Sequence, residues 1–309
     1  MADTYSAAQT NTNLSPPGPM EKDFENGYHL DGELDTDTAL RKIQTSGSIS
    51  ISPELFEKIY LSPQNKVAGD LRKTFGNPTP LALGGFLLSL TPLSCDLMGW
   101  RGAGGNGAAS TGVYFFFGGL LMILGSLGEF ILGNTFPFVV FGTFGAFWLA
   151  YAATLQPFYN AYGAYGDPTA ETFPGNGLET RGFNASFAFF LVFMGVLCFL
   201  YMILALRTNL VFFLIFLFLV PSFGLLAGAF WLLAEDFDPV NPNTANAATA
   251  KTCIIAAGAT TFVVDMLGWY IFFAILLASL DFPFQLSVVD LSRFVKGASD
   301  KARAREHQA

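Results

Sequence analysis

Histidine and cysteine are scarce in this chain. Its 309 residues include only two histidines and three cysteines. His29 and His307 lie near the two ends, which removes most histidine-based metal binding and general-base catalysis from the middle of the sequence. Cys95, Cys198 and Cys253 each lie in an apolar segment and form no C-x-x-C pair, so neither a zinc site nor a disulfide framework is indicated. We therefore expect no metal, no cofactor and no catalytic residue, and we predict that the chain is not an enzyme.

Charged residues are also few, at 13% of the chain, whereas 52% of the residues are hydrophobic and 34 are phenylalanine. A soluble globule needs more polar surface than this composition supplies, so the chain falls in the membrane class and its main environment is a lipid bilayer. The net charge of −8 arises mostly from acidic residues in the first 60 positions and after Gln156. These describe solvated segments and indicate no nucleic-acid partner.

Six apolar runs follow one another along the sequence. Each is long enough to cross about 30 Å of hydrocarbon at about 1.5 Å per residue. They cover residues 78–100, 112–133, 136–156, 184–206, 210–234 and 253–280. The predicted fold is an all-α polytopic membrane protein with six transmembrane helices in a bundle.

Basic residues fall mainly on one side of these six spans. The richer side carries Lys66, Arg72, Lys73, Arg207, Arg293, Lys296, Lys301, Arg303 and Arg305. The other side carries Arg101, Arg181 and Lys251. Because cytoplasmic loops hold the excess of Lys and Arg, both termini are predicted to be cytoplasmic, in a multi-pass protein of the plasma membrane.

The two ends differ from the middle. Residues 1–73 are polar, rich in Ser, Thr, Asp and Pro, and show no sustained period, which predicts a disordered acidic cytoplasmic tail. This start shows no signal-peptide pattern, so the first span is expected to direct insertion. Residues 286–309 are predicted to be a basic cytoplasmic tail against anionic lipid. The transporter domain suggested by the spans covers 74–285.

The first span begins with an unusual helix start. Asn77 is a favourable N-cap, and Pro78 and Pro80 suit the first turn, where a missing N–H removes no helical hydrogen bond. Free N–H groups and the positive end of the helix dipole at such a start can bind a small anion such as a carboxylate. The alternative is that these residues only start the helix.

Two blocks of sequence carry a resemblance to a known family. The first block reads GNPTPLALGGF at Gly76–Phe86 and resembles the N-P-[AG]-P-L-G-L-x-G-F signature of the acetate uptake transporter family, which includes fungal Ato and bacterial YaaH and SatP proteins. Thr79 and Ala82 depart from that signature. The second block resembles the family's G-x-x-E, G-N-T-F and F-x-S-[YF]-G-x-F-W motifs, and consists of Gly128–Phe130, Gly133–Phe136 and Phe141–Trp148. The resemblance covers roughly residues 75–285.

The resemblance implies a hexamer of six-helix protomers, each with its own pore for acetate. Matched residue by residue, the family's apolar constriction corresponds to Phe86, Phe144 and Leu219. A ring of apolar side chains at a pore waist blocks hydrated ions and passes a small desolvated molecule. Position 144 is commonly Tyr in bacterial relatives, so Phe144 lacks a hydroxyl that could contact the substrate. Apart from the resemblance, ordinary core packing is the favoured explanation of Phe86 and Phe144, because phenylalanine is so frequent in this chain.

Polar residues inside the spans are the remaining candidates, because such groups are tolerated mainly in the interior of a bundle. Ser89 and Thr143 are predicted to bind substrate together with Asn77 and Pro78, although a hydroxyl can instead bond a carbonyl one turn back. Small residues also recur four positions apart, which predicts close helix contacts. The pairs are Gly85 with Ser89, Gly142 with Ala146, and Gly224 with Gly228.

Two acidic residues are candidates for carrying a proton. Asp265 lies near the middle of the sixth span, where a lone carboxylate is costly and proton uptake relieves the cost. The family usually has a small residue near this place, so no role transfers to it. Glu129 matches an acidic residue of the family but lies near the cytoplasmic end of the second span. For both residues a structural hydrogen bond or ion pair remains the alternative.

These observations predict a membrane transporter for a small monocarboxylate, with acetate implied by the resemblance and proton-coupled uptake as the mode. One alternative is a passive channel for a neutral solute such as acetic acid or ammonia, which needs no titratable residue. Another is a non-transporting regulatory membrane protein that acts through its tails.

Overall fold

Six long helices form the body of the computed structural model. The structure describes residues 28–30, 49–51, 75–240, 242, 245–292 and 294–295. Most of the two predicted tails, 1–73 and 286–309, therefore lies outside the described residues, and their predicted character stays a prediction. Two short strands within the first tail, β1 (Tyr28–Leu30) and β2 (Ile49–Ile51), pair in parallel.

Six spans long and apolar enough to cross a membrane are found in the described residues, which confirms the predicted fold class. The long helices are α4 (Thr79–Leu97), α7 (Thr135–Leu155), α8 (Arg181–Ala205), α9 (Leu210–Asp236) and α10 (Ala247–Ser279). The second span is built from η2 (Gly105–Ser110), α5 (Thr111–Val113), η3 (Tyr114–Leu121) and α6 (Met122–Ile131).

The second span departs from a regular α-helix at η3, which is a π-helical stretch. Two consecutive glycines lie within it and bring its backbone close to α7. A side chain on Gly118 would collide with Trp148, and one on Gly119 would collide with Leu149. Small residues at such contacts let helix backbones approach each other, so η3 is held tightly between its neighbours.

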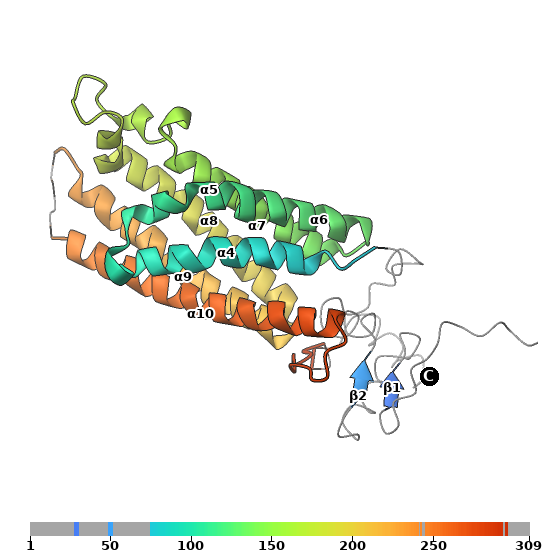
Figure 1. The fold of residues 1–309 in the computed structure, drawn as a ribbon. Helices are drawn as coiled ribbons and strands as arrows, with labels where there is room; N and C mark the ends of the chain where they lie inside the picture. The colour runs from blue at the N-terminus through green and yellow to red at the C-terminus, as the bar shows by residue number, and fades with distance from the viewer. Residues whose placement is uncertain are drawn as a thin grey trace, which may run out of the picture.

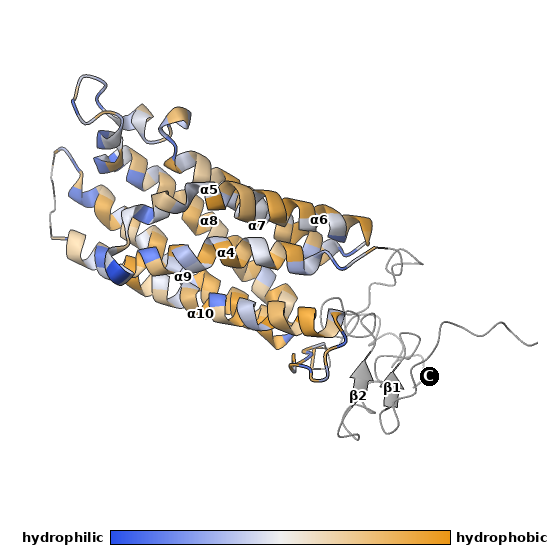
Figure 2. Ribbon diagram, in the orientation of Figure 1, coloured by the Kyte–Doolittle hydropathy of each residue, from blue (hydrophilic) through white to orange (hydrophobic). Residues whose placement is uncertain are grey.

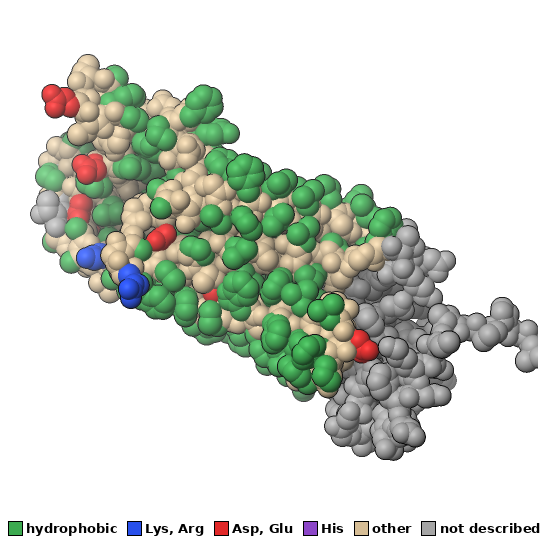
Figure 3. All heavy atoms as spheres, viewed as in Figure 1, with side chains coloured by type: hydrophobic (Ala, Val, Ile, Leu, Met, Phe, Trp, Pro, Cys, Tyr) green, Lys and Arg blue, Asp and Glu red, His purple; other side chains and the backbone are tan. Residues whose placement is uncertain are grey.

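The helices pack as a bundle in which α8 lies against α9, α9 against α10, and α10 against α4. The η3 and α6 parts of the second span join α4 to α7 (Figure 1). Hydrophobic residues dominate the helices, as Figure 2 shows, and green apolar side chains cover most of the face seen in Figure 3. Exposed apolar side chains of the bundle include Phe116 and Phe193, at 65% and 68% exposure. Such side chains are stable in hydrocarbon, where exposing an apolar group to lipid has no hydrophobic cost.

Both the start of α4 and the end of α10 lie at the same end of the bundle (Figure 1). We name this the inner end, and the opposite one the outer end. The long loop after α7 lies at the outer end and contains three 3₁₀ turns, η4 (Pro157–Tyr159), η5 (Gly163–Tyr165) and η6 (Gly175–Glu179). The glycine-rich connection after α4 is also held there, through η1 (Trp100–Gly102) and a 2.5 Å hydrogen bond from the Tyr151 hydroxyl to the Asn106 carbonyl.

A short extended segment follows α10 and crosses the inner end. We call residues 286–292 the C-terminal strap. The Leu210 N–H donates to the Val289 carbonyl at 2.8 Å, and the Leu291 N–H donates to the Thr208 carbonyl at 3.0 Å. Just before these two bonds, Val288 is buried in the core of the bundle, at 2% exposure. The strap thereby fixes the start of α9.

The small residues expected at helix contacts behave in two ways. A Cβ on Gly85 would meet the Phe117 carbonyl, and one on Gly142 would lie 3.0 Å from the Ser126 hydroxyl, so both positions make the predicted close contacts. Gly224 and Gly228 meet no described atom within 4 Å. The expectation of a close contact within the chain is therefore wrong for this last pair, because both glycines lie where no described neighbour approaches them.

Candidate functional site

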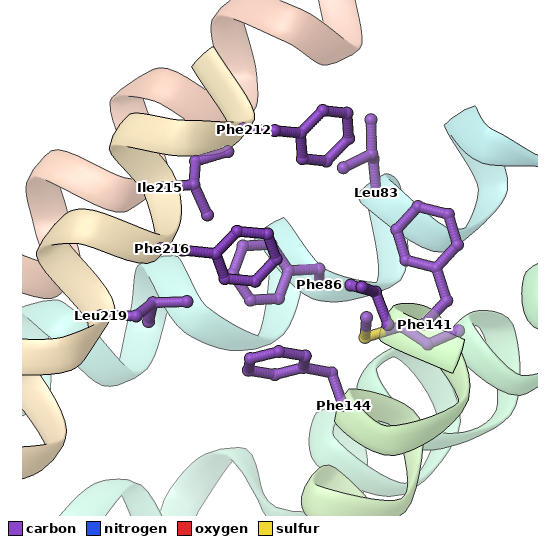
Figure 4. A pocket seen from close by; sticks show the side chains of 10 residues that line it. Leu83, Phe86, Phe141, Phe144, Phe212, Ile215, Phe216 and Leu219 are labelled. Carbon is purple, nitrogen blue, oxygen red and sulfur yellow. The ribbon is translucent and has the colours of Figure 1, made fainter. Parts of the chain in front are cut away.

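An apolar cavity lies between α4, α7 and α9, with α6 at its side (Figure 4). The empty space within it, counted together with the open space at its mouth, is about 340 Å³. Every side chain that lines it is apolar, and six of the ten are phenylalanine or methionine, which leaves no hydrogen-bonding group on its wall. The lining residues are Leu83, Phe86, Met122, Val140, Phe141, Phe144, Phe212, Ile215, Phe216 and Leu219.

The three residues predicted for the constriction all line this cavity. Phe86 and Phe144 meet edge to face with ring centroids 6.1 Å apart, and Leu219 faces the same space from α9 (Figure 4). Phe216, which the sequence did not single out, lies against Phe144 at 6.5 Å. Phenylalanine is so frequent in this chain that only the motif match could distinguish these rings from other core residues.

A buried hydrogen-bonded cluster lies at the inner end. The Glu129 carboxylate, fully buried, accepts a hydrogen bond from the Thr79 hydroxyl through Oε1. Its Oε2 accepts from the Asn134 side-chain amide at 2.6 Å. Thr79 and Asn134 are each 2% exposed. The cluster joins the first motif block to the second. Sequence reasoning did not identify Thr79 and Asn134 as partners of Glu129, from which they are 50 and 5 positions away along the chain.

Asn77 and Pro78 make hydrogen bonds to the backbone at the start of α4. The helix begins at Thr79 and its N-cap is Pro78, one position after Asn77, the cap that the sequence predicted. The Asn77 side-chain oxygen accepts from the Thr79 N–H at 2.9 Å. The Pro78 carbonyl accepts from the N–H groups of Leu81 and Ala82. The N–H groups of this turn are thus already engaged, so an anion bound there would have to displace one of them. Substrate binding by Asn77 and Pro78 stays a prediction.

Ser89 and Thr143 do not line the cavity. The Thr143 hydroxyl lies 3.0 Å from the Tyr201 hydroxyl and bonds carbonyls of its own helix, so it joins α7 to α8. Ser89 is fully buried where α4 meets η3. Their role in substrate binding also stays a prediction.

Asp265 is fully buried between α10 and α4. Its Oδ2 accepts from the Ser94 hydroxyl at 2.7 Å, and Thr261 lies 2.9 Å from that hydroxyl. Its Oδ1 has no hydrogen bond of ordinary geometry among the described residues, although the Thr91 side chain lies close enough to interact with the carboxylate. Asp265 is thus part of a polar contact between two helices and does not line the cavity.

Metal-ligating side chains do not gather in groups of three or more anywhere in the part of the chain that the structure describes. The arrangement therefore consists of an apolar cavity, a polar cluster at the inner end and a buried carboxylate between α4 and α10. Such a set can pass and orient a small amphipathic solute.

Comparison with known proteins places this geometry in a family. Protein alcS of Aspergillus fumigatus is 47% identical over 259 residues, which cover 84% of this chain and 91% of that protein. The acetate transporter protein patA of Aspergillus clavatus is 32% identical over 196 residues, which cover 63% of this chain and 71% of that protein. The solved structure of the bacterial acetate channel SatP matches with a TM-score of 0.47 and 25% identity, over 67% of this chain and 94% of that chain.

The family model described as GPR1/FUN34/yaaH matches residues 60–293. That range contains both motif blocks and all six spans, and it confirms the resemblance seen in the sequence. The chain belongs to the GPR1/FUN34/yaaH family.

Proposed function

We propose that this protein takes up a small monocarboxylate of the acetate class through the centre of its bundle, together with a proton, across the plasma membrane. The observation that carries the proposal is the cavity in which Phe86, Phe144 and Leu219 come together from three spans. The name of the related acetate transporter patA supports the substrate class.

An apolar waist favours a solute that has lost its charge. Hydrated ions are excluded because the rings offer nothing to replace their water, whereas a carboxylic acid can enter as the neutral molecule. Transport with one proton supplies this neutral form at the waist. In the proposal, Phe86, Phe144 and Leu219 form the waist, and Glu129 or Asp265 exchanges the proton.

In the proposal, the solute leaves the waist toward the cytoplasm past polar residues. Asn77 and Pro78 lie at the inner end, and Thr79 in the same turn is seven residues before Phe86, roughly 10 Å along the helix axis. The distribution of Lys and Arg supports a cytoplasmic location for this end and for both termini. Ser89 and Thr143 are the proposed contacts deeper in the membrane.

A homo-oligomer, a hexamer by family resemblance, is part of the same proposal. The glycines on α9 that meet no described neighbour, Gly224 and Gly228, are compatible with a second copy packing there. This pair supports an intermolecular contact without defining the number of subunits.

A second candidate function is passive passage of neutral acetic acid or another neutral solute. It is favoured by the entirely apolar lining of the cavity, which offers no group that would hold an anion. Both candidates accumulate acetate in a cytoplasm that is less acidic than the medium, because the neutral acid dissociates there. A passive channel gives a rate proportional to the concentration of undissociated acid, whereas a transporter saturates.

Uptake of radiolabelled acetate by a cell that lacks its own acetate transporters tests the proposal. We expect uptake above the empty-vector control that rises as the external pH falls, with accumulation abolished by a protonophore. An initial rate that rises in proportion to the concentration of undissociated acid and does not saturate would favour the passive channel. Uptake equal to the empty-vector control, with the protein present at the cell surface, would contradict both candidates.

A further inference from the structure

Two polar residues lie one helical turn beyond the Phe86–Phe144 pair, toward the outer end. Ser89 follows Phe86 by three positions on α4, and Trp148 follows Phe144 by four positions on α7. Residues three or four positions apart share a face of a helix. Because the two phenylalanine rings are in contact, the next layer on the same two helices brings Ser89 and Trp148 toward each other.

Both side chains are buried, at 0% exposure for Ser89 and 1% for Trp148. Neither the Ser89 hydroxyl nor the Trp148 indole N–H has a hydrogen-bond partner among the described residues. Buried polar groups are nearly always paired, so each exception needs an explanation. The indole of Trp269 shows the usual situation, because its N–H donates to the Thr91 hydroxyl at 3.1 Å.

The two residues meet over a single glycine of η3. A Cβ placed on Gly118 would lie 2.7 Å from the Ser89 hydroxyl oxygen and 2.7 Å from the Trp148 Cβ. The absence of a side chain at Gly118 thus allows α4 and α7 to bring these groups together. Tyr114 stacks on Trp148, with ring centroids 5.1 Å apart and planes inclined by 23°, and holds the indole in place. π-Helical segments are rare and frequently lie at functional sites, and η3 is eight residues long.

We propose that Ser89 and Trp148 form a subsite for the carboxylate of the transported solute, a small aliphatic monocarboxylate; this inference rests on the proposed function. A carboxylate is an acceptor with two oxygens, and the site offers two donors that lack acceptors. With the methyl group of acetate between Phe86 and Phe144, a donor atom that binds a carboxylate oxygen lies about 5 Å from the methyl carbon, because a hydrogen bond of about 2.8 Å adds to the length of the solute. Binding at this place requires the packing of Ser89 and Trp148 over Gly118 to open. Neutral donors hold the anion on the outer side of the waist without the strong attraction of a cation, and the solute then takes up the proton and passes the waist as the neutral acid.

Separate substitutions of Trp148 and Ser89 test the subsite. Trp148→Phe removes the N–H and keeps an aromatic ring, and Ser89→Ala removes the hydroxyl with little change in volume. Trp269→Phe is the matched control because its indole is already paired. We expect each site variant to raise the KM for acetate about ten-fold, the loss of one hydrogen bond to a charged group, with little change in the maximal rate per surface copy. The control is expected to keep the wild-type KM.

Equilibrium binding of labelled acetate to the purified protein separates this inference from the proposed function. A wild-type protein that binds but does not transport would contradict the proposed function, and the affinities of the variants would still decide the subsite. Wild-type affinity and KM in both Ser89→Ala and Trp148→Phe would overturn the subsite. If Trp148→Phe does not reach the membrane, Ser89→Ala with Ser89→Thr as its rescue decides alone. A wild-type protein that neither binds nor transports acetate would overturn both proposals.

Discussion

The hydroxyl of Thr79 donates a hydrogen bond to the carboxylate of Glu129, and both groups are buried. This contact fastens the start of the first span to the end of the second. Asn134, at the start of α7, bonds the other oxygen of the same carboxylate. Three spans are therefore fixed to one another at the inner end, on the side from which α4, α6 and α7 reach the cavity.

Removal of the shared acceptor should destabilise the bundle. Glu129→Ala deprives two buried donors of their acceptor, and we expect a loss of about 1–3 kcal/mol for each. Glu129→Gln retains an acceptor oxygen and should cost less. Thermal unfolding of the detergent-solubilised protein compares the stability of the two variants, and Glu171→Ala in the exposed outer loop is the control. Equal unfolding temperatures for Glu129→Ala and Glu171→Ala would contradict a structural role.

The sequence predicted the six spans well because each is a long apolar run, and the motif match identified the three residues of the waist. It could not pair Ser94 with Asp265, which are 171 positions apart, because the period of a single helix does not define its neighbour. The same limit hid the packing of Ser89 and Trp148 against Gly118. The close contact expected for Gly224 and Gly228 was wrong because spacing shows only that backbones can approach.

The waist should control the size of the solute. Phe86→Ala removes one ring from the cavity wall, and we expect uptake of butyrate to rise relative to that of acetate. The same change should cost about 3–5 kcal/mol of stability, so rates are normalised to protein at the cell surface. Phe193→Ala, which removes a ring exposed to lipid, is the control. An unchanged ratio of butyrate to acetate uptake in Phe86→Ala would show that this ring does not line the route.

Asp265 should matter for proton coupling if it carries the proton. Asp265→Asn keeps the size of the side chain and can still bond Ser94, but it cannot release a proton. We expect this variant to lose accumulation of acetate at acidic external pH while it still equilibrates acetate. Ser94→Ala keeps the carboxylate and is expected to keep accumulation. Normal pH-dependent accumulation in Asp265→Asn would rule out this residue as the carrier.

The outer loop should remain folded at the acidic pH of such assays. The Thr169 hydroxyl and N–H both donate to Asp167, at 2.6 and 2.8 Å, and hold the pKa of that carboxyl below its ordinary value. A lowered folded-state pKa contributes stability above the unfolded value of about 3.9, and the contribution is lost only as the pH falls through the lower folded value. Limited proteolysis of the loop should therefore give the same pattern at pH 7 and pH 5. New cleavage near Asp167 at pH 5 would contradict this.

Substitutions of two adjacent valines can test the core contact of the C-terminal strap separately from its backbone hydrogen bonds. Val288 is 2% exposed and packs into the bundle, whereas Val289 is 45% exposed, although its carbonyl accepts the Leu210 N–H. Val288→Ala removes buried apolar surface and should lower the free energy of unfolding by about 1–2 kcal/mol, while Val289→Ala should change it little. Thermal unfolding of both variants in the same detergent measures the difference. Because the strap fixes the start of α9, which carries Phe212, Val288→Ala should also alter the rate of solute uptake. If both valines behave alike, the strap is held by its backbone hydrogen bonds and not by the core.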